Sequence, residues 1–506
     1  MIRRRIYRRK LQRMLARVPD QAFFTMCWAT HAIQSGREAG VERILRFPPD
    51  AVVDRLNHPL SIHPWAIETL LNEALIAPKA LNIIGPISAC SSFSEMSRFF
   101  QVLNDLENEE HLLTPPAGRG IANLARISQR QFEWQRGFLS LPQVFRAGYL
   151  YGGPHARAHF ERKHGFTFEA FTFTCFAIHA ALMEAPCVRL TDGLEAYGFP
   201  RSVMAPVVAA ISRPIQEARQ VAAELRQGDG ETAYKISILR THPCVTFDDL
   251  IYAPLPELVS LRGSAGIFYD IVGGPPDATK EVGRQFERYT ERLLTAMTAP
   301  LRVSGEYKYS FRRQQQPTPD ILVYDQDELA LIVECKAVRM PLAARYSSVP
   351  DVSDANGYDE LAWGVRQIWR FASHVRRGLA PMERLSPAAI GMIVTLDTWL
   401  SMAPAVRNQV LRKAGDLADQ DPEIREQDRI PIAFALIDDL ESSLSVLTAQ
   451  QFLATVRAAT KAPYDGWLLF SILQELFPER GRQRPYPFEA EINQYVPWWK
   501  MKPGAE

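Results

Sequence analysis

Two acidic residues and one lysine occupy positions in this sequence where apolar residues are expected. Residues 319–336 read PDILVYDQDELALIVECK, which is two apolar runs separated by a short polar stretch at 325–328. Asp320 opens the first run, and Glu334 and Lys336 lie near the end of the second. Burying charged groups among apolar strands costs free energy unless they are paired, and this cost points to a chemical role.

The two apolar runs predict a β-hairpin that brings the three charged groups together. Side chains alternate between the two faces of a strand, so Glu334 and Lys336 project from one face and Cys335 from the other. Asp320 begins the neighbouring strand. We therefore expect Asp320, Glu334 and Lys336 to converge where one strand starts and the next one ends.

Two carboxylates and a lysine in this arrangement suit metal-dependent chemistry on a phosphodiester. Mg²⁺ prefers carboxylate oxygens as ligands, and a bound cation polarises a phosphate and lowers the pKa of a bound water. A neighbouring lysine can orient or deprotonate that water and offset charge on the phosphorane. Asp320, Glu334 and Lys336 could instead be a structural ion-pair set on the sheet, although an isolated buried pair seldom stabilises a fold much.

The flanking segments predict the elements that would position these groups. After Gly273-Gly274-Pro275-Pro276, an apolar stripe with helical spacing predicts a helix to about Met297, with Glu287 at the border of the stripe. After Pro300 the apolar residues recur at every second position, which is typical of β-strands. A mixed α/β sheet flanked by helices follows from the predicted order: strands 303–311, 320–324 and 329–338, helix 358–378, strand 390–396, helix 403–417 and strand 430–437.

The short motifs are not specific by themselves. Pro-Asp occurs five times in the chain and Glu-x-Lys three times. Asp277 with Glu306 and Lys308 forms a rival set, but Asp277 follows Gly-Gly-Pro-Pro and enters a helix instead of a strand. The Asp320 set alone lies on two apolar strands of a predicted hairpin, and this context favours it over the rival.

With that context, residues 277–440 resemble the PD-(D/E)XK nuclease superfamily, whose fold is restriction-endonuclease-like. Asp320 matches the first half of the family motif, and Glu334 and Lys336 match the second. The resemblance implies a Mg²⁺-dependent (or Mn²⁺-dependent) endonuclease that acts on DNA. It also implies a role in defence against foreign DNA.

The resemblance implies roles for three more residues. Glu287 in GRQFERYTERLL corresponds to a helix glutamate that assists metal binding, and the backbone carbonyl of Cys335 corresponds to a further metal ligand. Gln367 in GVRQIWRF matches a glutamine that several branches of the family add on the helix after the motif. For Gln367, an ordinary polar residue of a helix surface remains an equal alternative.

The rest of the chain predicts one further large region. With 506 residues, about two to four domains are expected. Residues 1–255 are predicted to be mostly helical and to recognise a partner, a nucleic-acid feature or a regulatory signal. We expect a linker at 256–276, the nuclease-like domain at 277–440 and a helical extension at 441–506.

Charge restricts where nucleic acid could bind. The net charge is +1, so any nucleic-acid surface must be a local patch. One candidate is the basic N-terminal segment MIRRRIYRRKLQRMLAR, which predicts a solvated helix. The other is a group of arginines that flank the predicted site and together could contact phosphates, although each one alone fits a solvated surface charge better: Arg312, Arg313, Arg366, Arg370, Arg376 and Arg377.

Composition narrows the cellular setting and the alternatives. The six cysteines are scattered without a Cys-x-x-Cys pair, and no apolar run reaches the ~20 residues of a membrane span. We therefore expect a cytoplasmic protein without a membrane anchor. Two alternatives stay open: a non-catalytic nucleic-acid-binding or scaffold protein on a nuclease-like fold, and a nuclease for RNA or a special junction.

Overall fold

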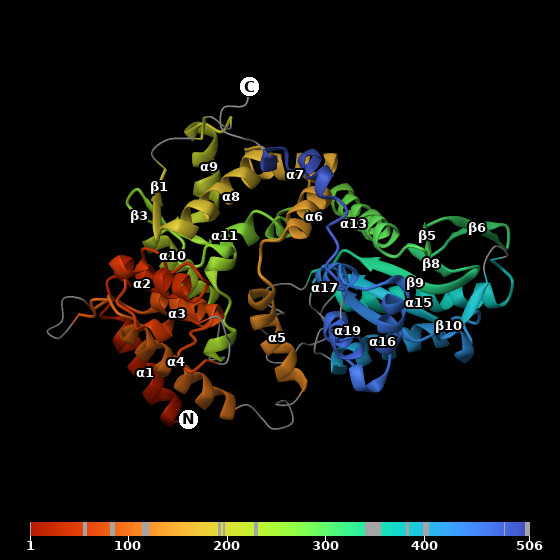
Figure 1. The fold of residues 1–506 in the computed structure, drawn as a ribbon, viewed down its shortest axis with the longest axis horizontal. Helices are drawn as coiled ribbons and strands as arrows, with labels where there is room; N and C mark the ends of the chain where they lie inside the picture. Colours follow the sequence, from red (N-terminus) through yellow and green to blue (C-terminus); the bar gives the residue numbers. More distant parts are fainter. Residues whose placement is uncertain are drawn as a thin grey trace.

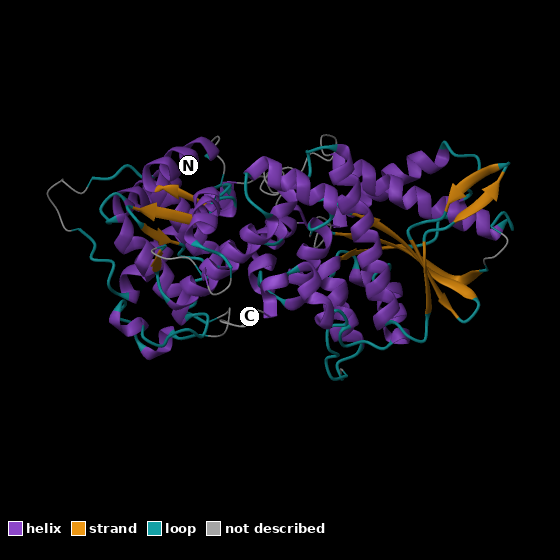
Figure 2. Ribbon diagram, turned by 90° about the horizontal axis from the view of Figure 1, so that it is seen from above, coloured by secondary structure: helices purple, strands orange, loops and turns teal. Residues whose placement is uncertain are grey.

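A computed structural model shows a mixed α/β protein with a large helical N-terminal region (Figure 1). The N-terminal helices form one end of the molecule, and the largest sheet lies at the other end (Figure 2). The structure describes residues 2–53, 58–80, 87–113, 121–190, 194–195, 198–226, 231–339, 356–380, 384–397, 404–479 and 481–500.

The structure confirms that the N-terminal region is mostly helical. The ten helices that the structure describes before residue 226 are α1 (Ile2–Leu15), α2 (Asp20–Ile33), α3 (Pro64–Ile76), α4 (Phe93–Leu113), α5 (Ile121–Arg136), α6 (Leu141–Tyr151), α7 (Pro154–His164), α8 (Phe168–Glu184), α9 (Arg201–Ile211) and α10 (Ile215–Leu225).

This region also contains a small sheet that the sequence did not predict. Its strand order is β1-β4-β3-β2, and β2 (Ser212–Pro214) lies between α9 and α10. The other strands are β1 (Cys187–Arg189), β3 (Cys244–Phe247) and β4 (Leu250–Tyr252). Strands of three or four residues are too short to show a period-two pattern, which explains why they were missed.

The candidate site belongs to a five-stranded mixed sheet with the order β11-β10-β9-β8-β5. The strands β5 (Arg302–Gly305), β8 (Ile321–Asp325) and β9 (Glu328–Lys336) pair antiparallel. The strands β10 (Leu385–Thr395) and β11 (Ile432–Leu436) extend the sheet from β9 in parallel. The predicted hairpin at 320–338 is therefore confirmed as β8 and β9.

Helices cover both faces of this sheet because its buried side chains alternate. Ile321 and Val333 pack on one face in the same apolar core as Phe286 of α13 (Pro276–Met297). Leu322 and Ile332 pack on the other face with helices α15 (Asn356–Arg376) and α16 (Pro404–Asp419). The ends of β8 and β9 are thus held between two helical layers.

The predicted strand 303–311 is divided in two. Its second half forms β6 (Lys308–Phe311), which pairs with β7 (Gln314–Pro317) in a separate hairpin. Arg312 and Arg313 make the turn with positive φ angles of 48° and 66°. A turn with two positive φ angles usually carries Asn or Gly, so the sequence gives no turn signal at this position.

The segment 256–276, predicted to be a linker, contains two short helices. These are α11 (Glu257–Arg262) and α12 (Phe268–Ile271), and Val259, Phe268 and Ile271 are buried in the same core as α13. After the sheet, α17 (Ile437–Leu444), α18 (Ala449–Ala458) and α19 (Leu469–Leu476) pack in this core as well. The core therefore continues across the predicted domain boundaries.

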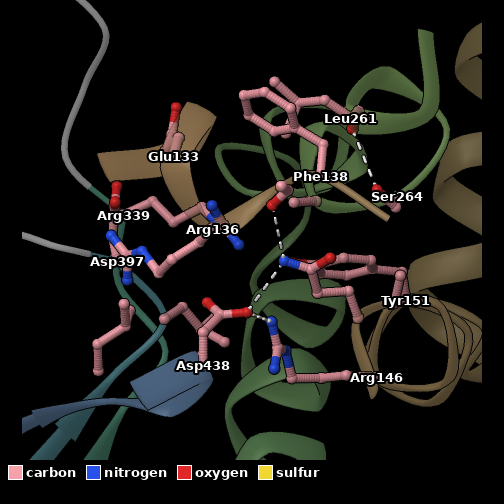
Figure 3. Close-up of a pocket in the computed structure, with 16 residues that line it drawn as sticks. Glu133, Arg136, Phe138, Arg146, Tyr151, Leu261, Ser264, Arg339, Asp397 and Asp438 are labelled. Carbon is pink, nitrogen blue, oxygen red and sulfur yellow. Dashed lines mark hydrogen bonds and ion pairs between the residues drawn. The ribbon is translucent and has the colours of Figure 1, made fainter. Parts of the chain in front are cut away.

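A buried arginine joins the N-terminal region to the sheet region. Arg146 of α6 is 5% exposed, donates to Asp438 at 2.7 Å and also pairs with Glu441, both on α17. Tyr289 of α13 donates to Glu441 at 2.5 Å. These contacts border a small cavity of about 60 Å³, where Figure 3 shows Arg146 directed at Asp438. Charged side chains largely fill this junction.

Among the helices that the structure describes, none alone has the length and hydropathy of a membrane span. Only α7 and α8 together, which meet at 72°, would reach those values by length and composition.

Removing Arg146 is expected to destabilise the fold strongly. Arg146→Met leaves the buried Glu441 and the half-buried Asp438 without their cation, and breaking a buried pair in this way costs about 3–5 kcal/mol. The matched control is Arg189→Met, because Arg189 pairs with Asp249 on the surface and should cost less than about 1 kcal/mol. Urea unfolding measures both variants. Equal losses would contradict the role given to Arg146.

Candidate metal centre

The pairing of β8 with β9 brings Asp320 and Glu334 together. Ile321 lies opposite Val333 in the antiparallel ladder, so the preceding Asp320 falls opposite the following Glu334. The Oδ2 atom of Asp320 accepts a hydrogen bond of 2.7 Å from the backbone N–H of Cys335. This bond fixes the aspartate against the end of β9.

Lys336 is tied to Glu334 by a direct ion pair. The Nζ atom of Lys336 lies 2.8 Å from Oε1 of Glu334, whose side chain is 3% exposed. The same amine donates to Oε1 of Gln367 on α15 at 3.4 Å. The structure thus places Glu334, Lys336 and Gln367 in one hydrogen-bonded chain between β9 and α15.

Glu287 of α13 lies in the same electrostatic environment as Asp320. Its side chain is half-buried. Burial, together with repulsion from Asp320 and Glu306, raises the pKa of Glu287 to about 7 against the opposing effect of Lys336. The acid predicted at the border of the helix stripe therefore senses the charges at the ends of β8 and β9.

The surroundings of Asp320 and Glu334 also disfavour the charged forms of these two carboxyl groups. Burial raises the pKa of Asp320, and the nearby Glu334 raises it further. Burial raises the pKa of Glu334, although Lys336 partly offsets this effect. Burial opposes the charge on Lys336, but Glu334 outweighs burial and raises the pKa of Lys336. One protonated lysine therefore faces three crowded carboxyl groups.

These residues fit a hard divalent cation by their chemistry. Oε2 of Glu334 is buried and has no hydrogen-bond partner among the described residues, and carboxylate oxygens suit Mg²⁺. Among the residues that the structure describes, however, no three histidine, cysteine or acidic side chains are already gathered as a metal-binding group. Burial raises the pKa of the Cys335 thiol well above its ordinary value, so the thiol stays protonated. The predicted role of Cys335 concerns its carbonyl.

Gly364 of α15 allows the helix to approach the site. A Cβ atom at this position would lie 2.9 Å from Cε of Lys336 and 3.2 Å from Cγ of Glu334. Any side chain would therefore displace the lysine or the helix. In the sequence Gly364 is only a glycine within a helical pattern. Its role becomes visible once the strand that faces it is known.

Glu306 is a second residue that the prediction left outside the site. It is exposed in the connection between β5 and β6, and its charge raises the pKa values of both Glu287 and Asp320. By sequence alone its Glu-x-Lys spacing forms the rival set with Asp277. The structure instead relates Glu306 to the Asp320 set.

Most of the arginines predicted to contact phosphates pair with acidic residues of the chain. Arg366 lies 2.6 Å from Asp421, and Arg370 lies 3.1 Å from Glu423. Arg312, in the β6–β7 turn, lies 3.2 Å from Glu423. Arg376 pairs with Asp428, and Arg377 donates to Ser373. Arg313 is exposed in the same turn as Arg312. The nucleic-acid role of these arginines stays a prediction.

The raised carboxyl pKa gives a pH-dependent test without substrate. A carboxyl group whose pKa is raised by folding contributes stability at low pH, and this contribution is lost as the pH rises through the raised value. Asp320→Asn removes the charge, so its gain in stability over the wild type should be larger at pH 8 than at pH 5. We expect a difference of at least about 1 kcal/mol, the equivalent of about one pKa unit, by urea unfolding in EDTA.

Asp327→Asn is the control, because Asp327 is exposed in the turn of the same hairpin. Its effect should not change with pH. A cation should relieve the repulsion, so Mg²⁺ at pH 8 should raise the melting temperature of the wild type but not that of Asp320→Asn. Equal pH profiles for the two variants would show that Asp320 is not crowded by other carboxylates.

Gly364→Ala tests the close approach of α15. We expect the amine of Lys336 to move and any activity at the site to fall by about 10- to 100-fold, since a shift of about 1 Å can have that effect. Gly415→Ala in α16 is the matched control: its Cβ would meet only Nη1 of Arg429 at 3.9 Å. That variant should retain activity. Full activity in Gly364→Ala would show that the site does not depend on the close approach of α15 to Lys336.

Comparisons with models of protein families, with curated proteins and with solved structures find no match to this chain. The chemistry of the site therefore rests on its own residues.

Proposed function

We propose that this protein is a Mg²⁺-dependent endonuclease that hydrolyses DNA phosphodiester bonds at the ends of β8 and β9. The observation that carries the proposal is the meeting of Asp320 and Glu334, with Lys336 bound to Glu334 at 2.8 Å. Three carboxyl groups with a single lysine leave an excess of negative charge that a divalent cation would neutralise.

In this proposal the cation, Mg²⁺ or Mn²⁺, would be held by four groups: the carboxylates of Asp320, Glu334 and Glu287 and the carbonyl of Cys335. When bound, such a cation polarises the phosphate and makes a bound water more acidic. Asp320 already accepts the N–H of Cys335 through Oδ2. Its other carboxylate oxygen would supply the metal contact, together with the buried Oε2 of Glu334.

Lys336 would act in its charged form. Glu334 raises its pKa, so the amine keeps its proton and serves better to orient water and to stabilise charge on the phosphate than to remove a proton. Gln367 would hold the amine in place, because its Oε1 lies 3.4 Å from Nζ of Lys336. Gln367 is thus a positioning residue in this proposal.

A non-catalytic protein on the same scaffold is the second candidate. One observation favours it: the amine of Lys336 lies on Oε1 of Glu334, as in a purely structural ion pair. In that case Asp320, Glu334 and Lys336 would stabilise the sheet, and nucleic acid would bind without being cleaved. A nuclease for RNA or a junction uses the same residues and differs only in substrate.

The expected setting of the nuclease is the cytoplasm. All six cysteines are free, and five of them are buried, which suits a reducing compartment. The resemblance of residues 277–440 to restriction-endonuclease-like nucleases makes defence against foreign DNA the proposed biological role.

Cleavage assays with purified protein test the proposal. Linear, circular and single-stranded DNA, and RNA, are incubated with Mg²⁺, with Mn²⁺ and with EDTA. Asp320→Ala and Lys336→Ala should each lose about 100-fold or more of the cleavage seen with the wild type, because each removes a group that acts in the reaction. EDTA should abolish cleavage.

The matched controls are Asp327→Ala and Lys308→Ala. Asp327 is exposed in the hairpin turn, and Lys308 belongs to the rival Glu-x-Lys set on β6. Both controls should cleave like the wild type. Metal-dependent cleavage that survives Asp320→Ala and Lys336→Ala would refute the assignment of the site. Binding of DNA without cleavage under every condition would favour the scaffold candidate.

A further inference from the structure

An open groove with a basic lining lies between helices α1 and α4, in the N-terminal region. Its volume is about 940 Å³. We call it the basic groove. It is lined by Ile6, Arg9, Lys10, Arg13, Met14, Arg17, Ile87, Ser88, Glu95, Arg98 and Phe99.

The orientation of α1 explains why its cations line the groove. Leu11 and Leu15 are buried in the N-terminal core, and Arg4 and Arg8 bind Glu110 of α4 at 3.2 Å and 2.6 Å. These contacts fix the rotation of α1 about its axis. The positions i, i+3 and i+4 on its remaining side then face the groove, which places Arg9, Lys10 and Arg13 there.

The positive charge of the groove is not neutralised by the chain. Its one acid, Glu95, accepts hydrogen bonds from Ser88 at 2.8 Å, from the N–H of Ser91 at 3.0 Å and from Ser92 at 3.0 Å. Within the described part of the chain, none of the five cationic side chains of the groove forms an ion pair. This contrasts with the arginines beside the candidate metal centre, which are largely paired.

We propose that the basic groove binds the phosphodiester backbone of a nucleic acid, at a place separate from the candidate metal centre. The choice of nucleic acid as the partner rests on the proposed function. Arg9 and Arg13 are four residues apart, about 6 Å along the helix, so successive cations can follow a phosphate chain. Contacts to phosphates carry no sequence information, so binding here is independent of sequence.

The two surfaces lie in opposite parts of the molecule. Helix α1 is at the N-terminal end, and the sheet with β8 and β9 is at the other end, in both views (Figures 1 and 2). A nucleic acid held in the basic groove must therefore extend along the molecule to reach the metal centre. The groove would retain the substrate while the metal centre cleaves it.

An anionic membrane surface is the other partner with the same charge. The exposed Ile2 and Ile6 would favour it. However, membrane-surface helices insert an apolar face into the lipid, and Leu11 and Leu15 of α1 are already buried in the protein core. A concave groove lined by cations is also better matched to a strand of phosphates than to a flat surface. These two observations favour nucleic acid.

Binding of labelled DNA in EDTA tests the inference without cleavage. Full-length wild type and Arg9→Ala/Arg13→Ala are titrated onto fluorescein-labelled double-stranded and single-stranded DNA, and anisotropy is followed at several salt concentrations. We expect the double variant to bind at least about 10-fold more weakly at low salt. The slope of log K against log salt should fall by about 1.8 on double-stranded DNA, since each lost phosphate contact contributes about 0.9.

The matched control is Lys461→Ala/Arg482→Ala, which also removes two exposed cations, both outside the groove. It should change affinity by less than about twofold. Arg9 and Arg13 form no ion pair with the residues that the structure describes, so the groove variant should unfold at the wild-type temperature. DNA binding with wild-type affinity and salt slope in the groove variant would overturn the inference.

Sedimentation with lipid vesicles distinguishes a membrane partner from nucleic acid. Wild type and groove variant are sedimented with vesicles of phosphatidylserine and phosphatidylcholine. If the groove variant loses vesicle binding but binds DNA like the wild type, the partner of the groove is a membrane surface and the inference is overturned. The proposed function fails by a different result, cleavage that does not depend on Asp320, so the two failures can be told apart.

Discussion

The register between β8 and β9 is the constraint on which the candidate site depends. Ile321 and Val333 lie opposite each other in the apolar core, and this pairing sets Asp320 against Glu334. A slip by one residue would move the buried side chains to the other face of the sheet, which the core opposes. The fold can therefore hold two carboxylates together although both resist ionisation there. Crowding of this kind is common where a protein binds a cation or transfers protons.

Much of this arrangement could be predicted from the sequence because it is encoded locally. The alternation of residues 320–338 shows two strands with a turn, and the stripe on α13 shows where Glu287 lies. What could not be predicted depends on contacts distant in sequence. Gly364 matters only because α15 crosses Glu334 and Lys336, and the acids at 421 and 423 that bind Arg366 and Arg370 follow about fifty residues later.

The N-terminal region is joined to the sheet by buried charge as well as by a shared apolar core. Arg146 reaches two acids of α17, and Glu441 also accepts the hydroxyl of Tyr289 in the helix that carries Glu287. The helix α13 thus takes part in both the junction and the candidate metal centre. These contacts tie α6 to α13 and α17, whereas the helices α1 and α4 of the basic groove belong to a separate apolar core.

Direct measurement of metal binding tests the central claim most sharply. Titration of the full-length protein with Mn²⁺, followed by electron paramagnetic resonance of the free ion, counts bound cations without substrate. The account predicts that the wild type and Asp327→Ala bind Mn²⁺, that Mg²⁺ displaces it, and that Asp320→Ala and Glu334→Ala lose this binding while remaining folded. Equal Mn²⁺ binding by all four proteins, or none by the wild type, would contradict the assignment of a metal centre to Asp320 and Glu334.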